Sequence, residues 1–206
     1  MRIERLENSK RKQERVLVYL EDGGILRITG AELLQFGLYQ GLDLPPETLA
    51  ALEAAARRSD TKRRGANMAA GRMLSKKELT SRLTRKGASP EDAADTADWL
   101  EELGAVDDAA YAGVIARHYG AMGCGVGRVR QELHRRGVPK ELWDEALAQL
   151  PPPEEAIRKF LRTKLRGRPL TPEDSRRMAA ALQRRGFSWQ DIRPALNELG
   201  QEIDEA

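Results

Sequence analysis

The residues best suited to binding a charged partner are the Lys and Arg side chains between positions 156 and 185. This segment has ten cations and two acids, a net charge of +8, although the whole 206-residue chain carries only +3. Arg158, Arg162 and Arg166 are spaced four apart and are predicted to share one helix face, with Lys159 beside them. Such a face can contact nucleic-acid phosphates or an acidic protein groove. The candidate partner-binding or DNA-binding residues are Arg158, Lys159, Arg162, Lys164, Arg166, Arg168, Arg176, Arg177, Arg184 and Arg185.

A solvated helix face is the alternative interpretation of this charge, because most runs of like charge serve solubility. Two observations favour a binding surface. The excess of cations is concentrated in one segment, and no acid lies between Ala156 and Thr171.

Other residue types that often carry chemistry do not converge on a catalytic or metal site. Asp107 and Asp108 are adjacent carboxylates, but at the start of a helix we interpret them as an N-cap and a first-turn acid that satisfy free backbone amides. His118, Cys124 and His134 lack the compact spacing of metal ligands. We therefore expect no metal, no cofactor and no enzymatic activity, with a site assembled across separate segments as the alternative.

The conspicuous glycine and aromatic residues are also interpreted as structural. Gly123-x-Gly-x-Gly127 lacks the preceding strand and the following Gly-Lys-Ser/Thr of a phosphate-binding loop. It is predicted to be a flexible joint. Tyr111 and Trp143 fall on apolar helix stripes and are interpreted as packing residues.

Three glycines, Gly87, Gly137 and Gly186, reveal an internal repeat. Each follows two cationic residues at the end of an apolar helical run, and neighbouring glycines lie 50 and 49 residues apart. A period of this size is typical of stacked helical units. The cations suit the negative end of a helix dipole, and each glycine is predicted to take the left-handed conformation that ends the helix.

Each repeat is predicted to contain three helices. One helix follows each glycine, and another precedes the glycine helix over residues 66–73, 107–119 and 153–166. The expected repeats span residues 66–104, 105–150 and 151–206. The predicted fold is mainly α, with tandem three-helix, helix-turn-helix-like repeats in an elongated array.

The first 65 residues are predicted to form a different region. Runs rich in β-forming residues at 15–20 and 25–29 flank Glu21-Asp-Gly-Gly24, which predicts a β-hairpin. Short helices are expected over 31–36 and 46–57. The polar segment 60–65 is predicted to be a linker before the first repeat, and Pro151-Pro-Pro153 a stiffer linker between the second and third repeats.

Composition and terminal sequence favour a cytoplasmic protein. The chain has no run of about 18 apolar residues, and residues 1–12 are charged without the apolar core of a signal peptide. The single cysteine, Cys124, fits a reducing compartment. We expect a monomer that does not enter a membrane.

The repeats resemble the RecX family in two motifs. These are Leu100-Glu-Glu-Leu103-Gly104-Ala-Val-Asp107-Asp108-Ala-Ala-Tyr111-Ala112 and Gly127-Arg-Val-Arg-Gln-Glu-Leu133-His-Arg-Arg-Gly137-Val138. The resemblance covers all three repeats, over about residues 69–199. The hairpin followed by Gly-Leu-x-x-Gly at residues 37–41 also resembles the amino-terminal extension common in that family.

The resemblance implies a negative regulator of the RecA recombinase. Such a protein binds the RecA filament on single-stranded DNA and inhibits ATP hydrolysis, strand exchange and coprotease activity, with a role in DNA repair and SOS control. The expected partners are the RecA filament, single-stranded DNA and, as a further possibility, double-stranded DNA. A generic DNA-binding protein that acts without RecA is the alternative function, and a protein-only scaffold is another.

Overall fold

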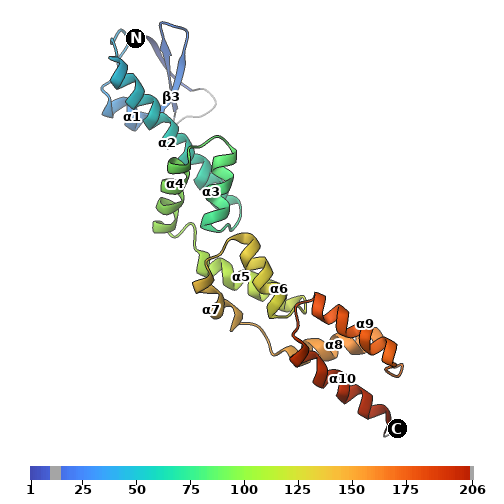
Figure 1. The fold of residues 1–206 in the computed structure, drawn as a ribbon. Coiled ribbons are helices and arrows are strands. Elements are labelled where there is room, and N and C mark those ends of the chain that lie inside the picture. Colours follow the sequence, from blue (N-terminus) through green and yellow to red (C-terminus); the bar gives the residue numbers. More distant parts are fainter. Residues whose placement is uncertain (10–14, 205–206) are drawn as a thin grey trace. The chain divides into compact units, whose positions relative to one another are not determined.

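The computed structural model describes residues 1–9 and 15–204, the last five of them as backbone only. It divides into two compact units. Unit 1 comprises residues 1–72 and 79–105, and unit 2 comprises residues 73–78 and those from 106 onward. The described chain is mainly helical, with one small sheet (Figure 1), which confirms the predicted fold class of tandem three-helix repeats.

Unit 1 begins with a three-stranded antiparallel sheet in the order β1-β2-β3. The strands are β1 (Ile3–Asn8), β2 (Arg15–Leu20) and β3 (Ile25–Thr29). The predicted hairpin is β2 and β3, paired from Tyr19 opposite Ile25 to Arg15 opposite Thr29. Strand β1 was not predicted, because its sequence is charged and only Ile3 is fully buried in the core.

The sheet packs on helices α1 (Gly30–Gln35) and α2 (Pro46–Gly71) through a shared apolar core. Thr29 and Glu32 form a capping box that starts α1 directly after β3. Helix α2 has 26 residues. It includes the segment 60–65, so the prediction of a linker there is wrong, and the two helices expected at 46–57 and 66–73 are one.

The polar segment stays helical because tertiary packing favours it. Gly65 is buried, and a β-carbon at this position would lie 2.5 Å from Thr96 Cγ2 and 3.2 Å from Leu100 Cδ1. Thr96 and Leu100 belong to helix α4 (Pro90–Glu102), which follows helix α3 (Lys76–Arg85). The glycine that suggested a break therefore allows α2 and α4 to pack closely.

Unit 2 contains the second and third repeats, each with its own apolar cluster. The second repeat comprises α5 (Asp108–Ala121), α6 (Val126–Arg136), a 3₁₀ turn (Lys140–Leu142) and the short α7 (Trp143–Leu147). The third comprises α8 (Pro153–Leu165), α9 (Pro172–Arg184) and α10 (Trp189–Asp204).

The repeated glycines end their helices as predicted. Gly87, Gly137 and Gly186 have φ values of 91°, 70° and 90°, all in the left-handed region that favours glycine. The packing interpretation of the two aromatic residues is also confirmed. Tyr111 is buried in the core of the second repeat, and Trp143 packs against that core while its indole N–H donates to the Val138 carbonyl at 3.0 Å.

Candidate nucleic-acid and partner interface

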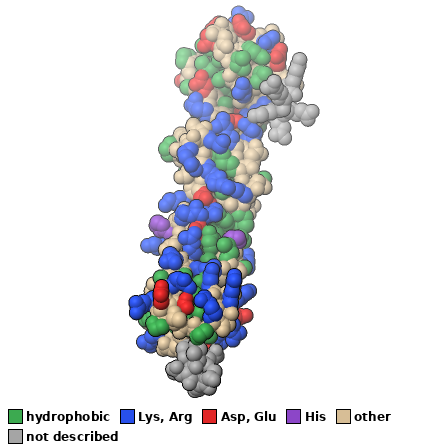
Figure 2. Space-filling model, turned by 90° about the vertical axis from the view of Figure 1, so that its right-hand side faces the viewer, with side chains coloured by type: hydrophobic (Ala, Val, Ile, Leu, Met, Phe, Trp, Pro, Cys, Tyr) green, Lys and Arg blue, Asp and Glu red, His purple; other side chains and the backbone are tan. Residues whose placement is uncertain are grey.

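All ten predicted binding cations are exposed on the third repeat. Four lie on α8, two in the turn after it, and the others on α9 or at its end. Figure 2 shows Lys and Arg side chains crowded over this repeat, in the lower part of the view. The structure therefore gathers them on one repeat, but their local surroundings differ: three have partners within the protein, Arg166 caps a helix, and six are unpaired among the described residues.

Three of the ten cations are held by groups within the protein. Arg158 forms an ion pair with Glu198 of α10 at 3.0 Å, and Arg177 pairs with Asp174 at 2.7 Å. The guanidinium of Arg185 lies 4.9 Å from the Phe160 ring centroid and donates to the carbonyls of Met122 and Gly123. The partner of Arg177 lies three residues earlier on the same helix, whereas the partners of Arg158 and Arg185 are distant in sequence and were not revealed by the local pattern.

Arg166 departs from the predicted helix face. Helix α8 ends at Leu165, and Arg166 is its C-cap with φ 51° and ψ 42°, a left-handed conformation. Its side chain therefore does not continue the row of Arg158 and Arg162. The prediction that all three share one helix face is wrong for Arg166.

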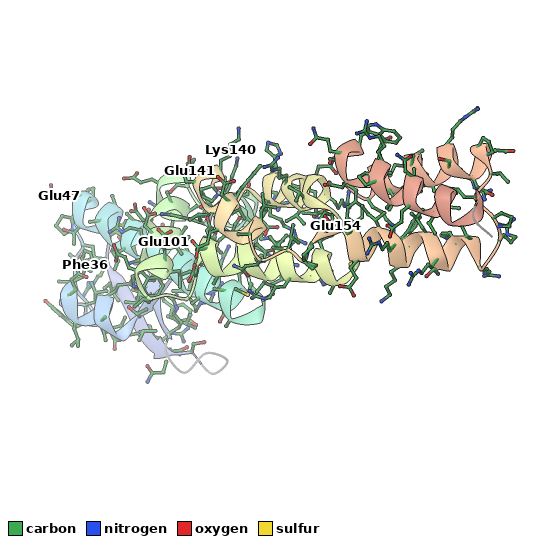
Figure 3. All side chains as sticks on the ribbon, turned by 90° about the horizontal axis from the view of Figure 1, so that it is seen from below. Phe36, Glu47, Glu101, Lys140, Glu141 and Glu154 are labelled. Carbon is green, nitrogen blue, oxygen red and sulfur yellow. The ribbon has the colours of Figure 1, made fainter. Side chains whose placement is uncertain are left out.

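Apart from Arg166, six of the ten cations form neither an ion pair nor a side-chain hydrogen bond with any residue in the described ranges, and we call them the six-cation set. Helix α8 begins with the acids Glu154, labelled in Figure 3, and Glu155, so negative charge lies at the positive end of its dipole. The cations follow later along the helix and beyond it. The set comprises Lys159, Arg162, Lys164, Arg168, Arg176 and Arg184.

The glycine-rich segment joins the second and third repeats instead of acting as a flexible joint. The amides of Gly125 and Gly127 donate to the carbonyls of Arg185 and Gly186, both at 2.9 Å. A β-carbon at Gly125 would lie 2.5 Å from the Gly186 oxygen, and one at Gly186 would lie 2.1 Å from the Arg128 nitrogen. We call these paired segments the glycine junction. The earlier interpretation is corrected because the missing side chains allow two backbones to meet.

A buried carboxylate in the second repeat forms ion pairs with two arginines at the surface. Glu132 is 4% exposed and accepts from Arg135 at 2.5 Å, with Arg128 at 3.0 Å. Burial alone would raise the pKa of Glu132, but the hydrogen bond and charge of Arg135, with Arg128, hold it below its usual value. Arg128 and Arg135 therefore belong to an ion-pair network around Glu132 within the second repeat.

Asp107 and Asp108 begin α5 as predicted. Asp107 is the N-cap and accepts from the Ala110 amide at 2.8 Å. The buried Asp108 has a further partner, because it accepts from the Lys76 amide at 2.9 Å. No group of three or more His, Cys, Asp or Glu side chains within the described ranges is arranged to hold a metal ion.

Unit 1 contains a groove of about 1660 Å³, lined by both polar and apolar side chains, that the sequence did not predict. On its wall, Asp60 is paired with Arg63 at 2.5 Å and Arg64 at 2.6 Å, and the buried Arg15 lies 3.8 Å away. Burial alone would raise the pKa of Asp60, but the hydrogen bond from Arg63 and the nearby arginine charges hold it below its usual value. The Asp60 carboxylate thus lies within 4 Å of three guanidinium groups.

In the part of the chain that the structure describes, no helix is both long enough and apolar enough to cross a membrane.

Two of the repeats match models of a known protein family. Residues 107–147 match the family model of the second three-helix domain of RecX, and residues 153–196 match that of the third.

Relatives named "Regulatory protein RecX" are similar to this chain over longer stretches than the two family models. The protein from Chlorobaculum tepidum is 33% identical over 139 residues, covering 65% of this chain and 84% of that protein. The protein from Lactobacillus delbrueckii subsp. bulgaricus is 29% identical over 211 residues, covering 96% of this chain and 75% of that protein. The Bacillus subtilis protein is 26% identical and covers 98% of this chain.

Solved structures show the same fold. A crystal structure of regulatory protein RecX aligns with 95% of this chain and 98% of its own, with a TM-score of 0.76 and 23% identity. That of RecX from Lactobacillus salivarius aligns with 70% of this chain, with a TM-score of 0.65 and 17% identity. With the two matched three-helix domains and a relative 33% identical over most of its length, the chain belongs to the RecX family of regulatory proteins.

Proposed function

We propose that this protein is a negative regulator of the RecA recombinase. It binds the RecA filament on single-stranded DNA and inhibits its ATP hydrolysis, strand exchange and coprotease activity. The single observation that carries the proposal is membership of the RecX family. The role in DNA repair and SOS control follows from the same proposal.

The six-cation set supports a nucleoprotein partner. Its side chains are exposed and have no acidic partner among the described residues, so they are available to phosphates or to acidic groups on the filament. Phosphate contacts of this kind supply affinity without sequence specificity. The tandem repeats add several such contacts on one chain, and linked contacts strengthen one another through effective concentration.

The test is ATP hydrolysis by the cognate RecA on single-stranded DNA. DNA is in excess, and this protein is added well below the RecA concentration, so that competition for DNA cannot explain inhibition. We expect strong inhibition at this ratio. Unchanged ATP hydrolysis would contradict the proposal, and salt-sensitive binding to bare DNA in the same preparation would then favour a generic DNA-binding protein.

Paired charge reversals test whether the third repeat makes the contact. The variant Lys159→Glu with Arg162→Glu removes two cations of the six-cation set. The control Arg58→Glu with Arg72→Glu makes the same charge change at exposed residues of unit 1 that form no ion pair with a described residue. If both cations contact phosphates of the single strand, the first variant lowers the slope of log filament affinity against log salt by about 1.4, or about 0.7 for each contact. Equal effects of the two variants would show that only total charge matters.

A further inference from the structure

Trp189 is an exposed aromatic residue beside the cations of the third repeat. It is the first residue of α10, and 50% of its surface is exposed. Two other exposed apolar residues, Val126 and Met122, lie in the glycine junction or contact it through Arg185. Val126 lies between the paired Gly125 and Gly127, and the carbonyl of Met122 accepts from Arg185.

The repeat fold does not require an aromatic residue at this position. Trp189 lies three residues after Gly186, and the equivalent positions after Gly87 and Gly137 are Pro90 and Lys140. The turn before α10 is held by Ser188 and Asp191, whose side chains form a hydrogen bond of 2.6 Å. Since this hydrogen bond does not involve the indole, the exposed part of the Trp189 side chain is free for a ligand.

Cations flank the indole on both sides along the chain. Arg193 is exposed and one helical turn after Trp189, so the two share a face of α10. Arg184, a member of the six-cation set, precedes it at the end of α9. Neither arginine forms an ion pair with a described residue. The equivalents of Arg193 in the other repeats are Ala94 and Asp144, so the combination is specific to the third repeat.

We propose that Trp189 stacks against an unpaired base of single-stranded nucleic acid while Arg184 and Arg193 contact the adjacent phosphates. An aromatic face with neighbouring cations is the arrangement that binds single strands without sequence preference. A duplex hides its base faces in the stack, whereas a single strand offers them. This inference rests on the proposed function, because it assigns to the third repeat the DNA component of the filament.

The experiment measures binding of the full chain to bare oligonucleotides, in the absence of RecA. The two probes are oligo(dT) and an abasic phosphodiester oligomer of equal length, which carries the same phosphates without bases. We expect Trp189→Ala to weaken oligo(dT) binding by about 5- to 100-fold, as for one stacked base. We expect the same variant to bind the abasic oligomer like the wild type, and Trp189→Phe to restore oligo(dT) binding to within about threefold.

Tyr39→Ala is the matched control, since Tyr39 is an exposed aromatic residue of unit 1 at 60% exposure. It should leave both affinities unchanged. Equal losses of Trp189→Ala on both probes, or no loss on oligo(dT), would overturn the base contact. In the separate RecA ATP-hydrolysis assay, loss of inhibition by Trp189→Ala together with normal oligo(dT) binding would also overturn the base contact and would assign Trp189 to a protein surface. Because RecA is absent from the binding measurement, a negative result would contradict only the base contact of Trp189. It would not contradict the proposed regulation of RecA.

Discussion

Replacing Gly186 with alanine would insert a methyl group where the second and third repeats meet. The new β-carbon would lie 2.1 Å from the Arg128 backbone nitrogen, a distance that no side-chain adjustment relieves. The residue also has φ +90°, which L side chains rarely adopt. The substitution therefore forces the paired backbones apart as well as straining its own turn.

The expected loss of stability has two parts. A left-handed conformation costs a residue with a β-carbon about 1–2 kcal/mol. Separating the backbones would also break the hydrogen bonds from Gly125 and Gly127, each worth about 0.5–1.5 kcal/mol. Together these give a destabilisation of about 2–5 kcal/mol for Gly186→Ala.

Gly87→Ala is the matched control. Gly87 has nearly the same φ, +91°, but no atom among the described residues lies within 4 Å of the position of its β-carbon. Its cost should be limited to the backbone strain of about 1–2 kcal/mol. The difference in unfolding free energy between the two variants thus measures the cost of separating the backbones at the glycine junction.

Urea unfolding and amide hydrogen exchange together measure the effect. We expect the amides of Gly125 and Gly127 to lose protection by about 5- to 100-fold in Gly186→Ala, which corresponds to the one or two lost hydrogen bonds. They should be unaffected in Gly87→Ala. Equal costs for the two alanine variants, with both amides still protected, would refute the reasoning.

Three further perturbations test the packing and the electrostatics. Leu133→Ala removes a side chain that is 0% exposed and should destabilise unit 2 by about 2–5 kcal/mol in urea unfolding; an unchanged midpoint would contradict its place in the core. Because the folded-state pKa of Glu132 is lowered, its stabilisation is present above its ordinary pKa of 4.5 and is lost as pH falls through the folded value. Glu132→Gln should therefore lower stability at pH 7 and flatten the acid loss below about pH 4.5, as followed by circular dichroism. Gly65→Ala should destabilise unit 1 through its contact with Thr96, whereas Gly71→Ala, with no described atom within 4 Å, should be neutral or stabilising in thermal unfolding.

The repeat fold could be predicted because its signals are local. A cation pair followed by glycine determines where a helix ends, and the spacing of apolar residues determines which face is buried. The strand Ile3–Asn8 gave no such signal, since most of its side chains face solvent. The continuity of α2 through residues 60–65 was hidden for another reason: it depends on Thr96 and Leu100, which lie about thirty residues further along the chain.

The candidate site could be located from the sequence but not resolved residue by residue. A charge count identifies the third repeat, because cations concentrate there whatever the fold. It does not show that Arg158 pairs with Glu198, 40 residues away, or that Arg185 lies over Phe160. The charge count also passes over Trp189, although the lack of an aromatic residue at the equivalent Pro90 and Lys140 distinguishes the third repeat in the sequence.

Helix α2 has a consequence for how the protein can be divided. Its 26 residues extend about 39 Å, and its buried positions contact the sheet near Leu52 and helix α4 near Gly65. A fragment that starts at residue 66 would cut this helix and remove Gly65 from its packing against the first repeat. Because one helix is shared by both cores, the sheet and the first repeat should melt in a single cooperative transition. The amino-terminal region is thus an inseparable half of unit 1, and deletion studies must remove or keep the two together.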